Sequence, residues 1–244
     1  MSDTIEARID ALLRARRDPA CLRIGVAGGS GSGKSTICDL MRTGLQPCAV
    51  TIIALDRFFK PTDQLPTYDS LYHGDRRPDF NRPDSLRVDE MIAFCRGVDG
   101  ADVVIFDSHF GLYYPEIRAL MDIKCFVAVD PAEMLDRRTR RNLAIGYGGD
   151  RETILNYNRE CVLPRYEEFI LPTRNYADIV IPNGSAETAE RDRWIGALCH
   201  RIRTTRTAAG PATGSIGGSV LTATGGPSRP GESIKRVIER TLSR

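Results

Sequence analysis

Residues 28–36 read GGSGSGKST and match the pattern G-x-x-x-x-G-K-[ST], which is the signature of a loop that wraps a polyphosphate. Such a loop turns consecutive backbone N–H groups toward the phosphates, and glycine allows the tight bend and close approach that this needs. The apolar run Leu22–Ala27 precedes the loop and a helical pattern begins at Thr36, a context that a flexible glycine–serine linker would lack. The sequence therefore predicts a strand, a phosphate loop and a helix whose positive N-terminus faces the same phosphates.

The loop residues are the candidate ligands of a nucleoside triphosphate, for which we expect ATP with Mg²⁺. In this pattern Lys34 reaches the β- and γ-phosphates, and the hydroxyl of Ser35 ligates the metal. The residues predicted to hold the nucleotide are Gly28, Gly29, Ser30, Gly31, Ser32, Gly33, Lys34, Ser35 and Thr36.

Apolar strand patterns alternate with helical patterns along most of the chain. The strand candidates are rich in Val and Ile and apolar on both faces, as a parallel sheet between two helical layers requires. They cover residues 22–27, 50–55, 103–106, 125–129 and 179–181; the helical patterns cover 3–17, 34–45, 84–95, 132–143, 151–169 and 187–203. This order predicts an α/β fold, a three-layer doubly wound parallel sheet of the phosphate-loop nucleoside triphosphate hydrolase type. Ligands of such sheets collect at the carboxyl ends of the strands, where Gly28, Asp56, Asp107 and Asp130 fall.

Composition divides the 244 residues into one domain, expected at 1–204, and a tail at 205–244 that is rich in Gly, Pro and Ser. The tail lacks the apolar surface that would offset the entropy of ordering, so we predict disorder there. The net charge of +2 gives no electrostatic case for nucleic acid or a membrane surface. Seven cysteines occur singly, without CxxC pairs, which is typical of reduced thiols in a cytoplasmic protein. The three histidines lack zinc-ligand spacing, and each is interpreted as a surface or loop residue.

Two strand-ending carboxylates are the candidate catalytic and metal-binding groups. Asp56 closes the second strand, where it could orient or deprotonate an attacking hydroxyl, although a turn or helix cap is the alternative. Asp107 closes the apolar strand at 103–107, at the position where a phosphate-loop kinase holds Mg²⁺.

A run of arginines at 137–141 follows Asp130 on a helical pattern. Arg138 and Arg141 are three positions apart and share a face, so both could clamp a transferring phosphoryl group. The other arginines of the run are as readily explained by a solvated face. Residues 143–152 contain three glycines between two helices and are a candidate lid that excludes water.

These segments together resemble the uridine kinase/phosphoribulokinase family. The matching pieces, in family order, are 28–35, DRFFK at 56–60, FNRPDS at 80–85, VVIFD at 103–107, RRTRR at 137–141 and PRYEEFILPTRNYADIVIPNG at 164–184. The last stretch is the most diagnostic, because the phosphate loop alone is shared by many families.

The resemblance implies a role for each matching residue. Asp56 matches the catalytic base, and Ser35 and Asp107 match the magnesium ligands. Asp84 matches the carboxylate that binds the sugar hydroxyls of a nucleoside, and Arg138 and Arg141 match arginines near the phosphates. The family also forms dimers or tetramers, which implies a homo-oligomer.

The chain departs from the family in the acceptor half. Uridine kinases carry a β-hairpin that reads the pyrimidine just before the strand that ends in Asp107, whereas here only residues 96–102 lie there, too few for two paired strands. The lid has YGGD where the family has two further arginines. Residues 62–82, with several aromatic and basic side chains, are an alternative acceptor wall. The family usually has Glu-Gly where this chain has Asp107-Ser108.

The leading interpretation is therefore an ATP-dependent kinase that acts on a hydroxyl of a small molecule, by default uridine or cytidine. Another sugar-like or hydroxylated acceptor is the alternative, as is an ATP-binding regulatory paralogue without transfer. A nucleotide switch would need D-x-x-G and an N-K-x-D guanine motif, which residues 107–110 and 175–178 do not supply.

Overall fold

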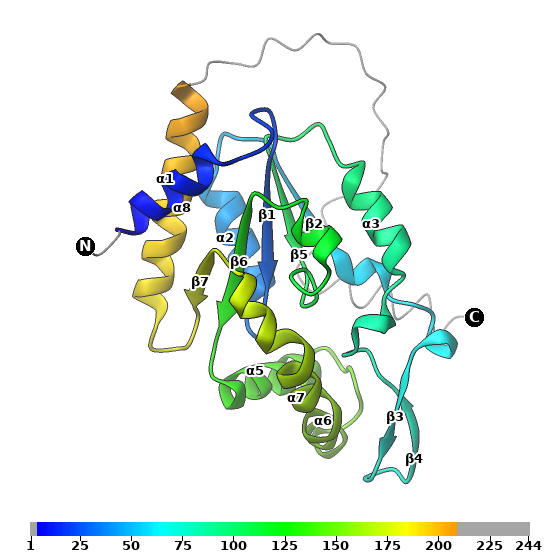
Figure 1. Cartoon of the computed structure of the whole chain (residues 1–244). Coiled ribbons are helices and arrows are strands. Elements are labelled where there is room, and N and C mark those ends of the chain that lie inside the picture. Colours follow the sequence, from blue (N-terminus) through cyan, green and yellow to red (C-terminus); the bar gives the residue numbers. More distant parts are fainter. Residues whose placement is uncertain (1–3, 209–244) are drawn as a thin grey trace.

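The computed structural model describes residues 4–208, and its centre is a sheet of five parallel strands in the order β2-β5-β1-β6-β7 (Figure 1). The strands are β1 (Leu22–Ala27), β2 (Val50–Ala54), β5 (Val103–Asp107), β6 (Ile123–Ala128) and β7 (Ile179–Pro182). All five strands predicted from the sequence are present, within two residues at each end. The doubly wound α/β fold is therefore confirmed.

Helices cover both faces of the sheet, because successive strand residues point to opposite sides and both sides are apolar. In β5, Val103 and Ile105 pack toward α1 (Ile5–Arg14), α2 (Lys34–Gly44) and α8 (Thr188–Ala208). Val104 and Phe106 pack on the other side toward α3 (Val88–Arg96) and α4 (Pro115–Arg118). The result is the three-layer arrangement that the sequence predicts.

The helices nearest the carboxyl edge of the sheet follow β6. Helix α5 (Pro131–Ala144) is capped by the preceding Asp130, whose side chain accepts hydrogen bonds from two first-turn amides. Helix α6 (Arg151–Tyr157) begins at Asp150 and continues through the π-helical turns Asn158–Val162 and Tyr166–Ile170 around the short α7 (Leu163–Arg165). Pro164 lies between the two π turns and has no N–H to donate, so the regular α-helical ladder is interrupted there.

Two features differ from the predicted elements. A second, two-stranded sheet pairs β3 (Thr67–Ser70) with β4 (Asp75–Pro78) in antiparallel fashion, inside the segment that the sequence suggests only as a wall. The helix expected at 84–95 begins later, at Val88, after the 3₁₀ turn Pro83–Ser85. Helix α8 runs to Ala208, and the rest of the predicted tail lies outside the described residues.

Candidate active site

The phosphate loop joins β1 to α2 and depends on glycine at several positions. Gly31 has φ +99°, and a Cβ there would lie 2.3 Å from the carbonyl oxygen of Met134 on α5. Gly33 has φ +92°, and a Cβ there would lie 2.4 Å from Nδ2 of Asn183. That Nδ2 donates to the carbonyl oxygen of Ser32 at 2.7 Å. The loop is therefore held between α5 and the residue after β7, in a shape that side chains would not permit.

Lys34, Ser35 and Asp107 lie together at the mouth of the loop. The Nζ of Lys34 donates to the carbonyl oxygen of Gly29 at 3.0 Å, and the hydroxyl of Ser35 donates to Oδ2 of Asp107 at 2.7 Å. Loss of hydration lowers the pKa of Lys34, although Asp107 and Asp56 act in the opposite direction. Burial also raises the pKa of Asp107, against the charge of Lys34 and the hydrogen bond from Ser35.

Asp56 lies in a 3₁₀ turn directly after β2, and its partner is a residue that the sequence prediction missed. Nδ1 of His109 lies 3.2 Å from Oδ1 of Asp56. Burial would raise the pKa of Asp56, but the charge and hydrogen bond of His109, with Lys34 and Arg141, hold it below its usual value.

The interpretation of His109 as a surface or loop histidine holds only for the loop, because His109 lies in the turn after β5 but is buried. Its residue is only 7% exposed, and its ring lies 5.7 Å from that of Phe59 and 4.2 Å from that of Phe110. The sequence held one signal for its pairing with Asp56. His109 follows strand β5 by two residues and Asp56 follows the neighbouring strand β2, so both lie at the same edge of the sheet.

The arginine run divides as its helical spacing predicts. Arg138 is 5% exposed and donates to Oδ1 of Asn158, while Arg141 reaches Oγ of Ser30 in the phosphate loop at 3.3 Å. Arg137 and Arg140 form i,i+4 ion pairs with Glu133 and Asp136 instead. Arg141 therefore contacts the phosphate loop, whereas the guanidinium of Arg138 lies against Asn158 in the segment after α6.

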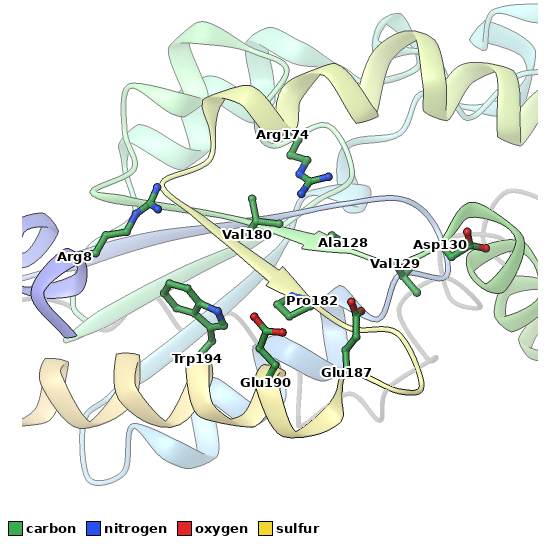
Figure 2. Close-up of a pocket in the computed structure, with 10 residues that line it drawn as sticks. All are labelled: Arg8, Ala128, Val129, Asp130, Arg174, Val180, Pro182, Glu187, Glu190 and Trp194. Carbon is green, nitrogen blue, oxygen red and sulfur yellow. The ribbon is translucent and has the colours of Figure 1, made fainter. Parts of the chain in front are cut away.

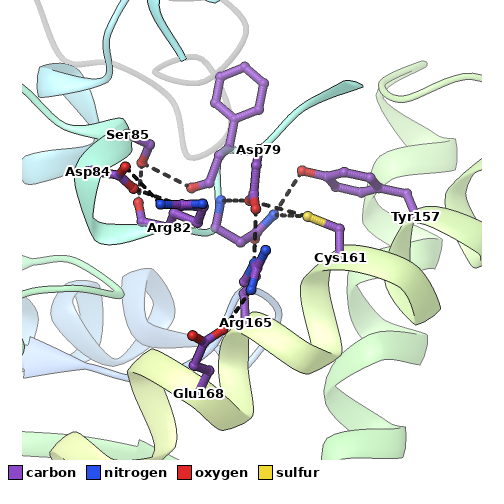
Figure 3. Close-up of polar contacts among 10 residues, drawn as sticks. Asp79, Arg82, Asp84, Ser85, Tyr157, Cys161, Arg165 and Glu168 are labelled. Carbon is purple, nitrogen blue, oxygen red and sulfur yellow. Dashed lines mark hydrogen bonds and ion pairs between the residues drawn. The ribbon is translucent and has the colours of Figure 1, made fainter. Parts of the chain in front are cut away.

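Asp84 lies apart from these groups. It forms an exposed ion pair with Arg82 at 2.9 Å, with 55% of its side chain accessible. The buried carboxylate of this region is Asp79, which is 0% exposed and accepts from Nε of Arg165 at 3.0 Å and from Sγ of Cys161 at 3.2 Å (Figure 3). Burial raises the pKa of Cys161 to about 12, with the charge of Asp79 acting in the same direction, so the thiol keeps its proton and donates it.

A cavity of about 190 Å³ lies between the β3–β4 hairpin and the α5–α6 region. Its lining residues include Tyr68, His73 and Arg77 from the hairpin and Arg138 and Tyr157 from the helices. The proposed acceptor wall at 62–82 therefore does face a cavity, whereas Asp84 is not among its lining residues.

A second, larger cavity of about 580 Å³ lies along the edge strand β7 beside α8, and its lining extends from Arg8 of α1 to Asp130 after β6 (Figure 2). Arg8, Glu190 and Trp194 line it, and so does Asp130, whereas none of the predicted catalytic, nucleotide-binding or metal-binding residues does.

The residues at the loop fit a magnesium nucleotide. The glycine cradle would be filled by any Cβ, and the nearby metal donors are a hydroxyl and carboxylates, the hard oxygen ligands that Mg²⁺ prefers. Among residues 4–208 no three His, Cys, Asp or Glu side chains form a metal cluster. None of the helices described is long and apolar enough to cross a bilayer.

A parallel sheet of this order, with a glycine loop between β1 and α2, defines the class of phosphate-loop nucleotide-binding proteins. A family model named "Phosphoribulokinase / Uridine kinase family" matches residues 95–190. Uridine-cytidine kinase B of Dictyostelium discoideum is 31% identical over 186 residues, covering 66% of this chain and 74% of that protein. Uridine kinase of Staphylococcus haemolyticus is 30% identical over 193 residues, which cover 69% of this chain and 91% of that protein. The chain therefore belongs to the phosphoribulokinase/uridine kinase family.

The lengths of the relatives differ widely. The chain spans 36% of Uridine-cytidine kinase A of Dictyostelium discoideum, to which it is 32% identical, and 42% of Uridine kinase-like protein 4 of Arabidopsis thaliana. A solved structure of a putative fructose transport system kinase from Silicibacter sp. TM1040 superposes with a TM-score of 0.48 at 17% identity, over 72% of this chain and 98% of that one.

Proposed function

We propose that the protein transfers the γ-phosphoryl group of ATP to a hydroxyl group of uridine or cytidine. The observation that carries this proposal is the grouping of Lys34, Asp56 and Asp107 at the mouth of a glycine loop, with Arg141 in contact with the loop itself. The names of the relatives supply the acceptor, since they are uridine or uridine-cytidine kinases.

In the proposed reaction the acceptor oxygen attacks the γ-phosphorus, and the bond between this phosphorus and the β–γ bridging oxygen breaks. Asp56 takes the hydroxyl proton, and His109 orients its carboxylate and favours the charged form. The electron pair of the broken bond leaves with ADP. Lys34, Arg138 and Arg141 offset the negative charge on the phosphoryl oxygens.

Ser35 and Asp107 are the residues that would hold Mg²⁺, which neutralises charge on the β- and γ-phosphates when bound. The 2.7 Å hydrogen bond from the Ser35 hydroxyl to Oδ2 of Asp107 supports this, because the two oxygens are neighbours at the mouth of the loop. Asp84, by contrast, is supported as a sugar ligand only by its place in the family motif, because its carboxylate is paired with Arg82.

Residues 143–152 are proposed to act as the lid. Gly146, Gly148 and Gly149 all have positive φ, a conformation that residues with a side chain rarely adopt, so the path of this connection depends on glycine. Tyr147 and Gly148 line the cavity beside the hairpin, so closure of this segment would shield the acceptor from water. The cytoplasmic location is part of the same proposal and is supported by seven cysteines that are all free thiols.

The test is an ADP-release assay with uridine, cytidine, pentose phosphates and hydroxy acids as acceptors. We expect turnover with the two nucleosides, and we expect Asp56→Asn to abolish it while ATP binding persists. Turnover only with other acceptors would favour the alternative kinase. ATP binding without product across the panel would indicate the regulatory paralogue.

A further inference from the structure

Asn183 lies directly after β7, and its buried side chain reaches the phosphate loop. Its Nδ2 donates to the carbonyl oxygen of Ser32 at 2.7 Å. Its backbone N–H donates at 2.8 Å to the carbonyl oxygen of Ala128, the last residue of β6. Asn183 is thus fixed to the carboxyl edge of the sheet and holds the loop at one carbonyl group.

The orientation of the Asn183 amide is set by a second contact. Oδ1 accepts from Nη1 of Arg191 on α8 at 3.4 Å, so the oxygen end of the amide faces α8 and the NH₂ end faces the loop. A Cβ at Gly33 would lie only 2.4 Å from Nδ2, because the amide packs directly against the peptide unit that joins Ser32 to Gly33. The contact therefore acts on one peptide unit of the loop.

The carbonyl of Ser32 and the N–H of Gly33 are the two polar groups of that peptide unit. In a planar trans peptide they point in opposite directions. With the carbonyl turned toward Asn183, the N–H of Gly33 points away from Asn183, and it donates to no group among residues 4–208. It lies directly before α2, whose first-turn amides have no acceptor within the helix either. The N–H of Gly33 is therefore available to a polyphosphate, together with the helix N-terminus.

We propose that Asn183 is a positioning residue for nucleotide binding, because its amide holds this peptide unit in the orientation that aims the N–H of Gly33 at the phosphates. Glycine restricts φ very little, so the peptide unit before Gly33 could otherwise rotate. A rotated unit would present the carbonyl oxygen of Ser32 to the phosphates, and that oxygen repels an anion where an N–H attracts it. The inference rests on the proposed function only for a nucleotide at the loop, and it is independent of the acceptor.

The experiment measures the Kd of a non-hydrolysable ATP analogue with Mg²⁺ by calorimetry in the wild type, Asn183→Leu and Asn175→Leu. Leucine is close to asparagine in size and has no donor, so Asn183→Leu should raise the Kd about tenfold through loss of the hydrogen bond and of the amide that it aims. The KM for ATP should rise with the Kd, while the KM for the acceptor stays unchanged. Asn175 is the matched control, because it precedes β7, is exposed and makes no side-chain hydrogen bond within the described part of the chain.

The variant Asn183→Asp adds a pH readout that a merely structural role would not produce. An ionised carboxylate cannot donate to the carbonyl oxygen of Ser32, whereas a protonated carboxyl group can. A carboxyl group buried beside a carbonyl oxygen also takes up its proton at a higher pH than usual. The ratio of the variant's Kd to that of the wild type should therefore be largest at pH 8 and decrease toward pH 5. For Asn183→Leu the same ratio should not change with pH.

The outcomes separate this inference from the proposed function. An unchanged Kd in Asn183→Leu, or a Kd that rises only in Asn183→Asp, would overturn the inference and leave the kinase proposal intact, since the latter result is charge repulsion alone. Absence of binding by the wild type would overturn both. Urea denaturation shows which variants are folded, and Asn183→Ala takes the place of Asn183→Leu if leucine is not accommodated.

Discussion

Replacing His109 by Phe should move the acid limb of the pH–rate profile to higher pH. The substitution keeps a ring between Phe59 and Phe110 and removes the N–H that faces Asp56. A hydrogen bond to a charged group contributes about 1.5–3 kcal/mol, and one pKa unit corresponds to about 1.4 kcal/mol. Because 33% of the Asp56 side chain is exposed, the lower end of that range applies, and we expect the pKa of Asp56 to rise and the acid limb to move with it.

The sign follows from the direction of the shift. His109 lowers the pKa of Asp56, so the wild-type carboxylate stays charged, and able to accept a proton, at a pH where the variant's carboxylate is already protonated. The assay is kcat/KM for the acceptor at saturating ATP across the pH range in which both proteins are folded. His200→Phe on the exposed side of α8 is the control.

The result that refutes this reasoning is an acid limb that stays in place while kcat falls equally at every pH. Such a uniform loss would mean that His109 only supports packing. The variant His109→Asn lacks the ring but has an amide that can still donate to Asp56. Its acid limb should lie between those of the wild type and His109→Phe, which distinguishes loss of the donor from loss of the ring.

Three further predictions concern the phosphate loop, its lysine and the buried ion pair of Asp79. Gly31→Ala should lower the free energy of unfolding by about 2–3 kcal/mol in urea denaturation, whereas Gly146→Ala, which also has positive φ but meets no atom within 4 Å, should cost only about 1 kcal/mol. Lys34→Met should reduce kcat about 10²–10³-fold in the ADP-release assay without unfolding the protein; a loss under threefold would contradict its proposed role. Asp79→Asn should lower the free energy of unfolding by about 3 kcal/mol, because the buried ion pair with Arg165 loses its anion. The control Asp84→Asn, in an exposed pair with Arg82, should lower it by less than about 0.5 kcal/mol. Similar losses for both variants would show that burial of the Asp79–Arg165 pair is unimportant.

The nucleotide half of the protein is predictable from the sequence because its information is local. The glycine loop, the strand before it and the helix after it are contiguous; the strand is an apolar run buried at nearly every position, and the buried residues of the helix recur with helical spacing. The carboxyl ends of parallel strands share one edge, so Asp56 and Asp107 could be placed on the same side of the sheet before any contact was known.

The acceptor half is less predictable because its contacts are long-range. The strands of the hairpin read TYDS and DRRP, with no apolar alternation to reveal them. Their position depends on Glu160, which lies 90 residues after Ser70. Likewise, the pairing of His109 with Asp56 joins the ends of two adjacent strands that are far apart in the chain, a contact that sequence spacing alone does not encode.

The two edges of the parallel sheet explain why an acceptor wall can follow β2 in this chain. In a parallel sheet, the chain enters every strand at the amino edge. Residues 97–102, which lead into β5, lie at this edge: the carbonyl oxygen of Asp102 accepts from the N–H of Leu22, the first residue of β1. A wall inserted there would have to extend along the whole sheet before it reached the phosphate loop. The β3–β4 hairpin leaves from the carboxyl edge beside Asp56, so two strands of four residues are enough to place Arg77 across the cavity from Arg138. If residues 62–82 form the acceptor wall, as proposed, this connection needs less structure than the one before β5 and leaves the phosphate loop unchanged, in keeping with functional sites that are added to a fold.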